Sequence, residues 1–160
     1  MSSPPSRPAV LFVCLGNICR SPLAEAAFRQ AAAEAGLDVE IDSAGTGDWH
    51  VGRPPDRRAQ ATALRYGIDI SDYRARQLHP SDFERFSHIL ALDHSNLDDI
   101  QAVAPASARA EITLLLDIVE GRAGEAVADP YFGDDTGFEV TWADVTAAAR
   151  ALVERLTRGR

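Results

Sequence analysis

The sequence contains no lysine, only two cysteines and no apolar run long enough to cross a membrane. All 16 of its lysine-plus-arginine positions are arginine, and the 24 acidic residues outnumber them, so the net charge is −8. This charge argues against nucleic-acid binding. Two cysteines cannot form a disulfide framework, which favours a reducing, cytoplasmic location. We therefore expect a protein that binds neither nucleic acid nor membrane.

The four histidines also lack the spacing of metal ligands, and we interpret them as ordinary surface or core residues. They are His50, His79, His88 and His94. The length of 160 residues suits one domain with a full core. Residues 1–8, MSSPPSRP, lack the apolar segment of a secretory signal and are predicted to be a disordered lead. A single domain is predicted over residues 9–158.

Apolar runs alternate with helical patterns along this domain. That alternation predicts an α/β fold, with a parallel sheet and right-handed crossovers. Strands are expected at residues 9–13, 39–43, 88–92 and 111–116. Helices are expected at residues 23–35, 56–66, 95–103 and 138–156, with one helical turn at 81–86. Ligands of such sheets bind beyond the carboxyl ends of the strands.

A short loop joins the first strand to the first helix, and it has the features of an anion site. Cys14 ends the apolar run, and the loop to Arg20 contains Gly16. Ser21 is predicted to cap the following helix, with Pro22 at its first position. Loop N–H groups and a helix N-terminus present partial positive charge to one point. Arg20 offers two parallel donors to phosphate oxygens, and Ser21 can stabilise a thiolate at Cys14.

Three segments resemble one known family. The segment Cys14-Leu15-Gly16-Asn17-Ile18-Cys19-Arg20-Ser21-Pro22 resembles the phosphate loop of the low-molecular-weight protein tyrosine phosphatases. The segment from Asp129 to Asp134, DPYFGD, resembles their general-acid loop. Trp49, in the segment from Asp42 to Gly52, resembles a wall of their substrate cleft. The resemblance spans about residues 8 to 157.

The resemblance implies a four-stranded parallel sheet flanked by helices, and hydrolysis of phosphotyrosine without a metal or another cofactor. Cys14 would attack phosphorus and form a phosphocysteine, with Arg20 and the loop N–H groups holding the oxygens. Asp129 would protonate the leaving phenolate and then activate water. The residues expected to bind substrate are Leu15, Gly16, Asn17, Ile18, Cys19, Ser21, Trp49, Tyr131 and Phe132. The expected partners are tyrosine-phosphorylated proteins, and the chain is expected to be a monomer or weak dimer.

The resemblance also assigns supporting roles. Asn17, Ser21 and Ser43 would form a hydrogen-bond network that fixes the loop, and Asn17 is expected to tolerate a left-handed backbone. Cys19 would trap oxidised Cys14 as a disulfide. The family often has a His in the network where this chain has Tyr73, and often a second Tyr where it has Phe132.

Three other functions are possible on the same motifs. Arsenate reduction requires further cysteines to carry a disulfide outward, and none exists beyond Cys19. Protein arginine phosphatases are similar in sequence but carry Thr where this chain has Ile18, so Ile18 favours phosphotyrosine. A phosphotyrosine-binding module without turnover is the third alternative. The presence of Cys14, Arg20 and Asp129 favours an enzyme instead.

Overall fold

The computed structural model describes residues 7–158, so residues 1–6 of the expected lead lie outside the described part. Its sheet has four parallel strands in the order β2-β1-β3-β4, as the resemblance implies. The strands are β1 (Ala9–Cys14), β2 (Glu40–Gly45), β3 (His88–Ala91) and β4 (Glu111–Leu114). The helices are α1 (Arg20–Ala35), α2 (Arg57–Arg65), α3 (Asp82–Arg85), α4 (His94–Val103), the 3₁₀ turn η1 (Leu115–Ile118) and α5 (Asp135–Arg158).

Strand β1 is central, and its alternating side chains enter two separate cores. Val10, Phe12 and Cys14 pack in a cluster with α1 and α5. Leu11 and Val13 pack in a second cluster with apolar residues of α3 and α4. Because both faces are buried, the strand reads as a continuous apolar run rather than an alternating one.

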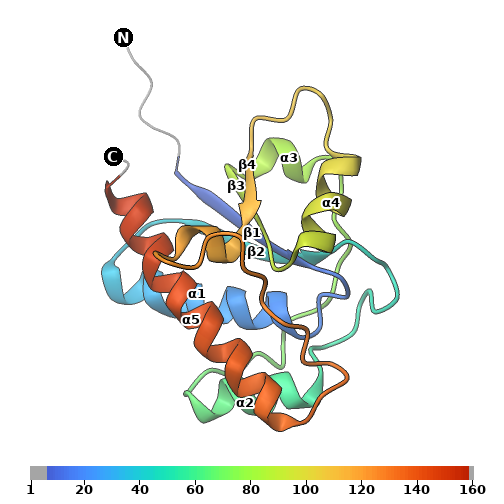
Figure 1. Cartoon of the computed structure of the whole chain (residues 1–160), viewed down its shortest axis with the longest axis vertical. Coiled ribbons are helices and arrows are strands. Elements are labelled where there is room, and N and C mark those ends of the chain that lie inside the picture. Colours follow the sequence, from blue (N-terminus) through green and yellow to red (C-terminus); the bar gives the residue numbers. More distant parts are fainter. Residues whose placement is uncertain (1–6, 159–160) are drawn as a thin grey trace.

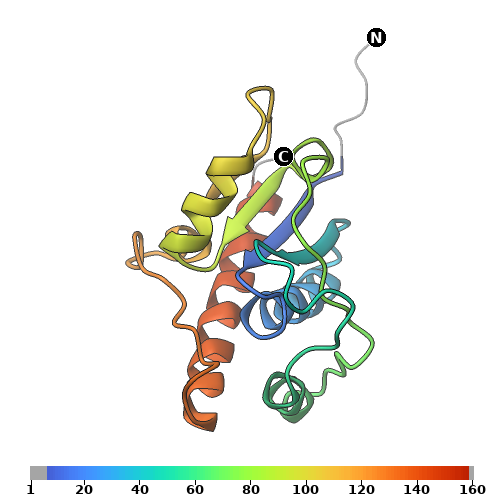
Figure 2. The ribbon, with the colours of Figure 1, turned by 90° about the vertical axis from the view of Figure 1, so that its right-hand side faces the viewer.

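The helices cover both faces of the sheet, and this prediction is confirmed. Helices α1 and α5 pack side by side, and α2 contacts α5 (Figure 1). Helix α4 lies on the other side of the sheet (Figure 2). Gly36 ends α1 with φ of 66°, a left-handed conformation that glycine adopts without steric cost. Because β1 ends at Cys14, the loop that follows lies at the carboxyl end of this central strand.

Several predicted boundaries are wrong. Helix α1 begins at Arg20, with Cys19 rather than Ser21 at the N-cap position and no side-chain cap. The hydroxyl of Ser21 instead contacts the Cys14 thiol and the Asn17 amide. The last predicted strand stops at Leu114, because the chain tightens into η1. Helix α5 begins at Asp135, three residues before the predicted start at residue 138.

Within residues 7–158, no helix combines the length and apolar character needed to span a bilayer.

Candidate active site

The loop from Cys14 to Arg20 forms the floor of a cavity of about 180 Å³. The floor is lined by Cys14, Leu15, Gly16, Ile18, Cys19 and Arg20. The walls are Trp49, His50, Asp129, Tyr131 and Phe132. The structure thus brings together residues that are up to 118 positions apart (14 to 132). Asn17 and Ser21, which we predicted to bind substrate, lie buried behind this lining.

Close contact with the end of β2 shapes the loop. A Cβ atom on Gly45 would lie 2.7 Å from the carbonyl oxygen of Leu15, so the loop could not pass with any larger residue there. Backbone N–H groups of Thr46 and Gly47 donate to the carbonyls of Cys14 and Leu15, each at 2.9 Å. Among the hydrogen bonds of the described residues, none uses the N–H of Leu15, Gly16, Ile18 or Cys19 as donor. Such free donors suit a bound phosphate.

The thiol of Cys14 is buried at this floor and surrounded by donors. Its side chain is 3% exposed. The sulfur lies 3.1 Å from Ser21 Oγ and accepts a hydrogen bond from the Asn17 N–H at 3.3 Å. A thiolate, the nucleophilic form of cysteine, could accept hydrogen bonds at both positions.

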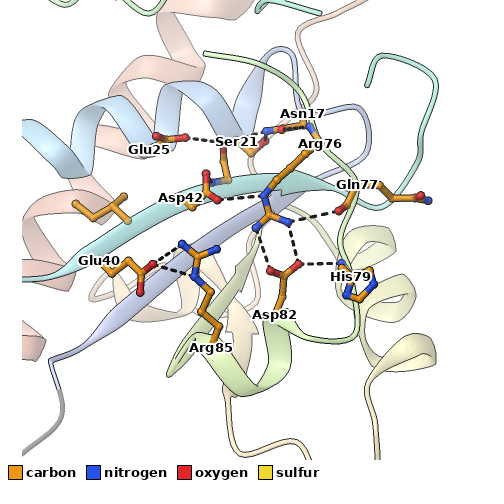
Figure 3. Close-up of polar contacts among 12 residues, drawn as sticks. Asn17, Ser21, Glu25, Glu40, Asp42, Arg76, Gln77, His79, Asp82 and Arg85 are labelled. Carbon is orange, nitrogen blue, oxygen red and sulfur yellow. Dashed lines mark hydrogen bonds and ion pairs between the residues drawn. The ribbon is translucent and has the colours of Figure 1, made fainter. Parts of the chain in front are cut away.

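Asn17 holds the loop in shape. Its φ of 57° is the one positive value at a non-glycine residue in the described part of the chain, as predicted for Asn. The side-chain amide donates to Ser21 Oγ at 2.7 Å and to Ser43 Oγ at 3.0 Å. Its oxygen accepts from the backbone N–H of Arg76 at 3.0 Å. In Figure 3 the Arg76 side chain is itself fixed between Asp42 and Asp82.

The network continues to two residues that the sequence analysis missed. Ser43 donates to Glu25 Oε1 at 2.7 Å, and Arg29 donates to Glu25 Oε2 at 2.8 Å. Tyr73 lines a small cavity of about 80 Å³ beside Asn17, Glu25 and Ser43. Within residues 7–158, no hydrogen bond joins Tyr73 to Asn17, and burial raises the pKa of Tyr73 to about 12. Glu25, acting through Ser43, therefore braces Asn17.

The burial of Glu25 leads to a pH-dependent effect on stability. Burial raises the pKa of this carboxyl group, although its hydrogen bonds to Ser43 and Arg29 oppose the shift. A raised folded-state pKa gives stability that is complete below about pH 4.3 and is lost as the pH rises through the folded value. We expect Glu25→Gln to remove this part of the pH dependence. Urea unfolding between pH 4 and 8 measures it, with exposed Glu34→Gln as the control. An unchanged slope in Glu25→Gln would contradict the effect.

Arg20 is buried, 3% exposed, and held by an acidic partner. One terminal nitrogen donates to Asp93 Oδ2 at 2.7 Å and to the carbonyl of Val127 at 3.0 Å. The other lies 3.7 Å from Asp129 Oδ2. Burial lowers the pKa of Arg20, but the Cys14 thiolate and Asp93 outweigh it and raise that pKa. The guanidinium is thus held by fixed partners at the cavity lining and remains charged.

Asp129 and two aromatic rings approach from the loop before α5. The carboxylate is 41% exposed, and it accepts the Tyr131 N–H at 3.1 Å in an Asx turn. The rings of Tyr131 and Phe132 meet edge to face with centroids 4.9 Å apart. Trp49, which is 68% exposed, lines the same cavity. His50, which the sequence analysis did not place in the site, also lines it and lies beside Gly16.

Arg58 connects the acid loop to the phosphate loop. Its guanidinium donates to the carbonyls of Tyr131 at 2.9 Å and Gly133 at 3.2 Å, and it lies 5.6 Å from the Tyr131 ring centroid. It also pairs with Asp56, whose own N–H donates to the carbonyl of Ile18 at 2.9 Å. Because the fork binds two carbonyls and one carboxylate, a lysine could not replace all of these contacts.

If Asp129 has the general-acid role that the resemblance implies, we expect Arg58→Gln to slow the reactions in which it donates a proton. The acid loop would lose its clamp, and kcat for phenyl phosphate would fall about tenfold, while 2,4-dinitrophenyl phosphate would change little. Arg58→Lys should fall between Arg58→Gln and wild type. Steady-state rates on both esters test this, with exposed Arg57→Gln as control. Equal losses on the two esters would mean that Arg58 does not position the acid.

The described residues contain no cluster of three or more His, Cys, Asp or Glu side chains placed to bind a metal ion.

Comparison with known proteins gives the family. The model of the low molecular weight phosphotyrosine protein phosphatases matches residues 9–160. The chain belongs to this family. It is 47% identical over 132 residues to the low molecular weight phosphotyrosine protein phosphatase of Schizosaccharomyces pombe, covering 81% of this chain and 84% of that protein.

Solved structures of similar proteins share the fold. YfkJ of Bacillus subtilis superposes with a TM-score of 0.90 at 38% identity, covering 99% of both chains. A drosophila arginine phosphatase superposes with a TM-score of 0.86 at 32% identity, and the match covers 92% of the present chain and 96% of the arginine phosphatase.

Proposed function

We propose that the protein hydrolyses phosphotyrosine in proteins through a phosphocysteine intermediate, without a metal ion. The observation that carries this proposal is the meeting of Cys14, Arg20 and Asp129 in one cavity, with Arg20 3.7 Å from Asp129. The aromatic walls at Trp49 and Tyr131 suit a flat leaving group. The protein would act in the cytoplasm as a monomer or weak dimer.

The first step transfers the phosphoryl group to sulfur. The Cys14 thiolate attacks phosphorus, a P–S bond forms, and the bond from phosphorus to the phenolic oxygen breaks. Arg20 and the loop N–H groups stabilise the charge on the three equatorial oxygens. Protonated Asp129 gives its proton to the departing phenolate.

The second step releases phosphate. Water attacks phosphorus, Asp129 accepts a proton from it, and the P–S bond breaks to restore the thiolate. Both steps depend mainly on holding the reacting groups in the right geometry, and the hydrogen-bond network around the loop supports that geometry.

A parallel assay tests the proposal. We expect phosphotyrosine peptides and p-nitrophenyl phosphate to be hydrolysed in EDTA, and phosphoserine peptides to remain. Loss of activity on chelation would overturn the metal-free mechanism. Phosphoarginine is a necessary arm, since a drosophila arginine phosphatase has the same fold. Faster hydrolysis of phosphoarginine than of phosphotyrosine would reassign the substrate and contradict the reading of Ile18.

Cys19 is proposed to protect Cys14 from irreversible oxidation. Both are buried free cysteines in the same cavity lining. Peroxide would convert the Cys14 thiolate to a sulfenic acid, and the Cys19 thiol would condense with it to give a disulfide and water. Burial, followed by Asp56, raises the pKa of Cys19, so its thiol is protonated at neutral pH and must give up its proton, which leaves in the water, as it attacks the sulfenic sulfur.

We expect activity to return with dithiothreitol after peroxide treatment, and about threefold more fully in wild type than in Cys19→Ser. The sulfenic acid of that variant has no neighbouring thiol and can oxidise further. Residual activity on p-nitrophenyl phosphate measures recovery, with untreated enzyme of each variant as reference. Equal recovery would leave Cys19 as a packing residue.

A further inference from the structure

A second groove opens beside the candidate active site. Its volume is about 430 Å³, and we name it the α4 groove because Asp99, Ala102 and Val103 of α4 form one side. These three positions are spaced i, i+3 and i+4 and so share one helix face. Leu78 and Pro80 line it from the loop before α3. None of these five residues lines the cavity that contains Cys14.

The two cavities share a partition. Leu15 and Trp49 line both of them, and their side chains are 42% and 68% exposed. The indole of Trp49 lies so close over Gly47 that a Cβ atom there would be 1.9 Å from the ring. Gly47 also lines the groove, so the partition depends on a residue without a side chain. A ligand in the active-site cavity therefore reaches the groove by passing one indole ring.

The lining defines the chemistry of an occupant. Leu15, Leu78 and Val103 give it an apolar character, and Val103 is 53% exposed. Within the described part of the chain, Asp99 is the one charged residue of the lining. The side chain of Gln77, also in the lining, points away from the ion pairs of Arg76 with Asp42 and Asp82 in Figure 3. An apolar side chain next to a positively charged one fits this surface.

We propose that the α4 groove binds the polypeptide next to the phosphotyrosine of a protein substrate, taking an aliphatic side chain with a basic residue near Asp99. This inference rests on the proposed phosphatase function. An extended chain advances roughly 3.3 Å per residue. A residue two or three positions from the phosphotyrosine is therefore far enough along the peptide to lie beyond the Trp49 side chain. Continuity through Trp49 favours this occupant over an unrelated ligand.

A leucine scan of a phosphopeptide tests the proposal. One leucine is placed in turn at each position within three residues of the phosphotyrosine, in a peptide of otherwise Gly and Ser. We expect one position to raise kcat/KM about five- to tenfold, as partial burial of a leucine would give. Arginine added one residue beyond should raise it by a further factor of about two at low salt.

Two exposed variants locate the effect. Ala102→Glu and Val103→Glu should remove the leucine gain and leave kcat/KM for p-nitrophenyl phosphate unchanged, since both lie on the surface of α4. Gln101→Glu introduces the same charge on the same helix outside the lining and should retain the gain.

The outcomes separate the two proposals. If leucine gives no gain at any position, or if both glutamate variants keep the gain, the proposed groove binding is wrong and the proposed phosphatase function stands. No hydrolysis of p-nitrophenyl phosphate or any peptide by the wild-type protein would overturn the proposed function, and the groove with it.

Discussion

Replacing Cys14 by serine should reduce turnover of p-nitrophenyl phosphate by about 10⁴-fold or more, the scale seen when an enzyme loses its nucleophile. The Ser21 hydroxyl, 3.1 Å from the Cys14 sulfur, and the Asn17 N–H, at 3.3 Å, can both donate to a thiolate. A serine hydroxyl stays protonated at neutral pH and is a far weaker nucleophile. Initial rates at saturating substrate measure the effect.

The same variant should still bind inorganic phosphate. Binding depends on Arg20 and the loop N–H groups, which the substitution leaves in place, and isothermal titration calorimetry detects it. Retained binding with lost turnover distinguishes a missing nucleophile from a collapsed loop. Turnover close to wild type would exclude Cys14 as the nucleophile.

The second large effect is expected at Asp129. Asp129→Asn should lower kcat for phenyl phosphate by about 10²–10⁴-fold, because the phenolate would leave without a proton. The loss should shrink steadily across esters with better leaving groups, such as p-nitrophenyl and 2,4-dinitrophenyl phosphate. A plot of log kcat against leaving-group pKa is the measurement.

Asp134→Asn serves as the matched control. Asp134 lies in the same loop and accepts the Thr136 N–H, a contact that asparagine preserves. It should behave like wild type on every ester. If log kcat does not vary with leaving-group pKa in either wild type or Asp129→Asn, another group supplies the proton.

The loop from Cys14 to Ser21 could be predicted from the sequence because its features depend on residues that are neighbours in the chain. A strand end, a glycine-containing loop and a helix start are all visible between Cys14 and Ser21. Asp129, 115 residues later, carries no local mark beyond a turn-forming Asp-Pro. Its place in the site came from resemblance to a family. The cavity that joins it to Arg20 required the fold.

The residues that brace the loop were missed for a physical reason. Glu25 and Arg29 lie one and two turns along α1 from Ser21, so their spacing places all three on one helix face. Taken alone, Glu25 and Arg29 look like a solvent-exposed i,i+4 pair. Glu25 is instead buried, and its carboxylate accepts a hydrogen bond from Ser43 of β2, which no local pattern places beside α1. The helix start was misplaced for a related reason, since the Ser21 hydroxyl is engaged by Cys14.

Asp93 links thermal tolerance to turnover through one carboxylate. Its Oδ1 accepts the Asn96 N–H and caps α4, while its Oδ2 holds Arg20. Asparagine caps helices about as well as aspartate but has no charge to offer a guanidinium. An Asp93→Asn variant would keep a capping side chain for α4 but leave the buried guanidinium of Arg20 without its carboxylate, so it would both melt lower and turn over more slowly than wild type. Heat resistance and activity therefore cannot be adjusted independently at this position.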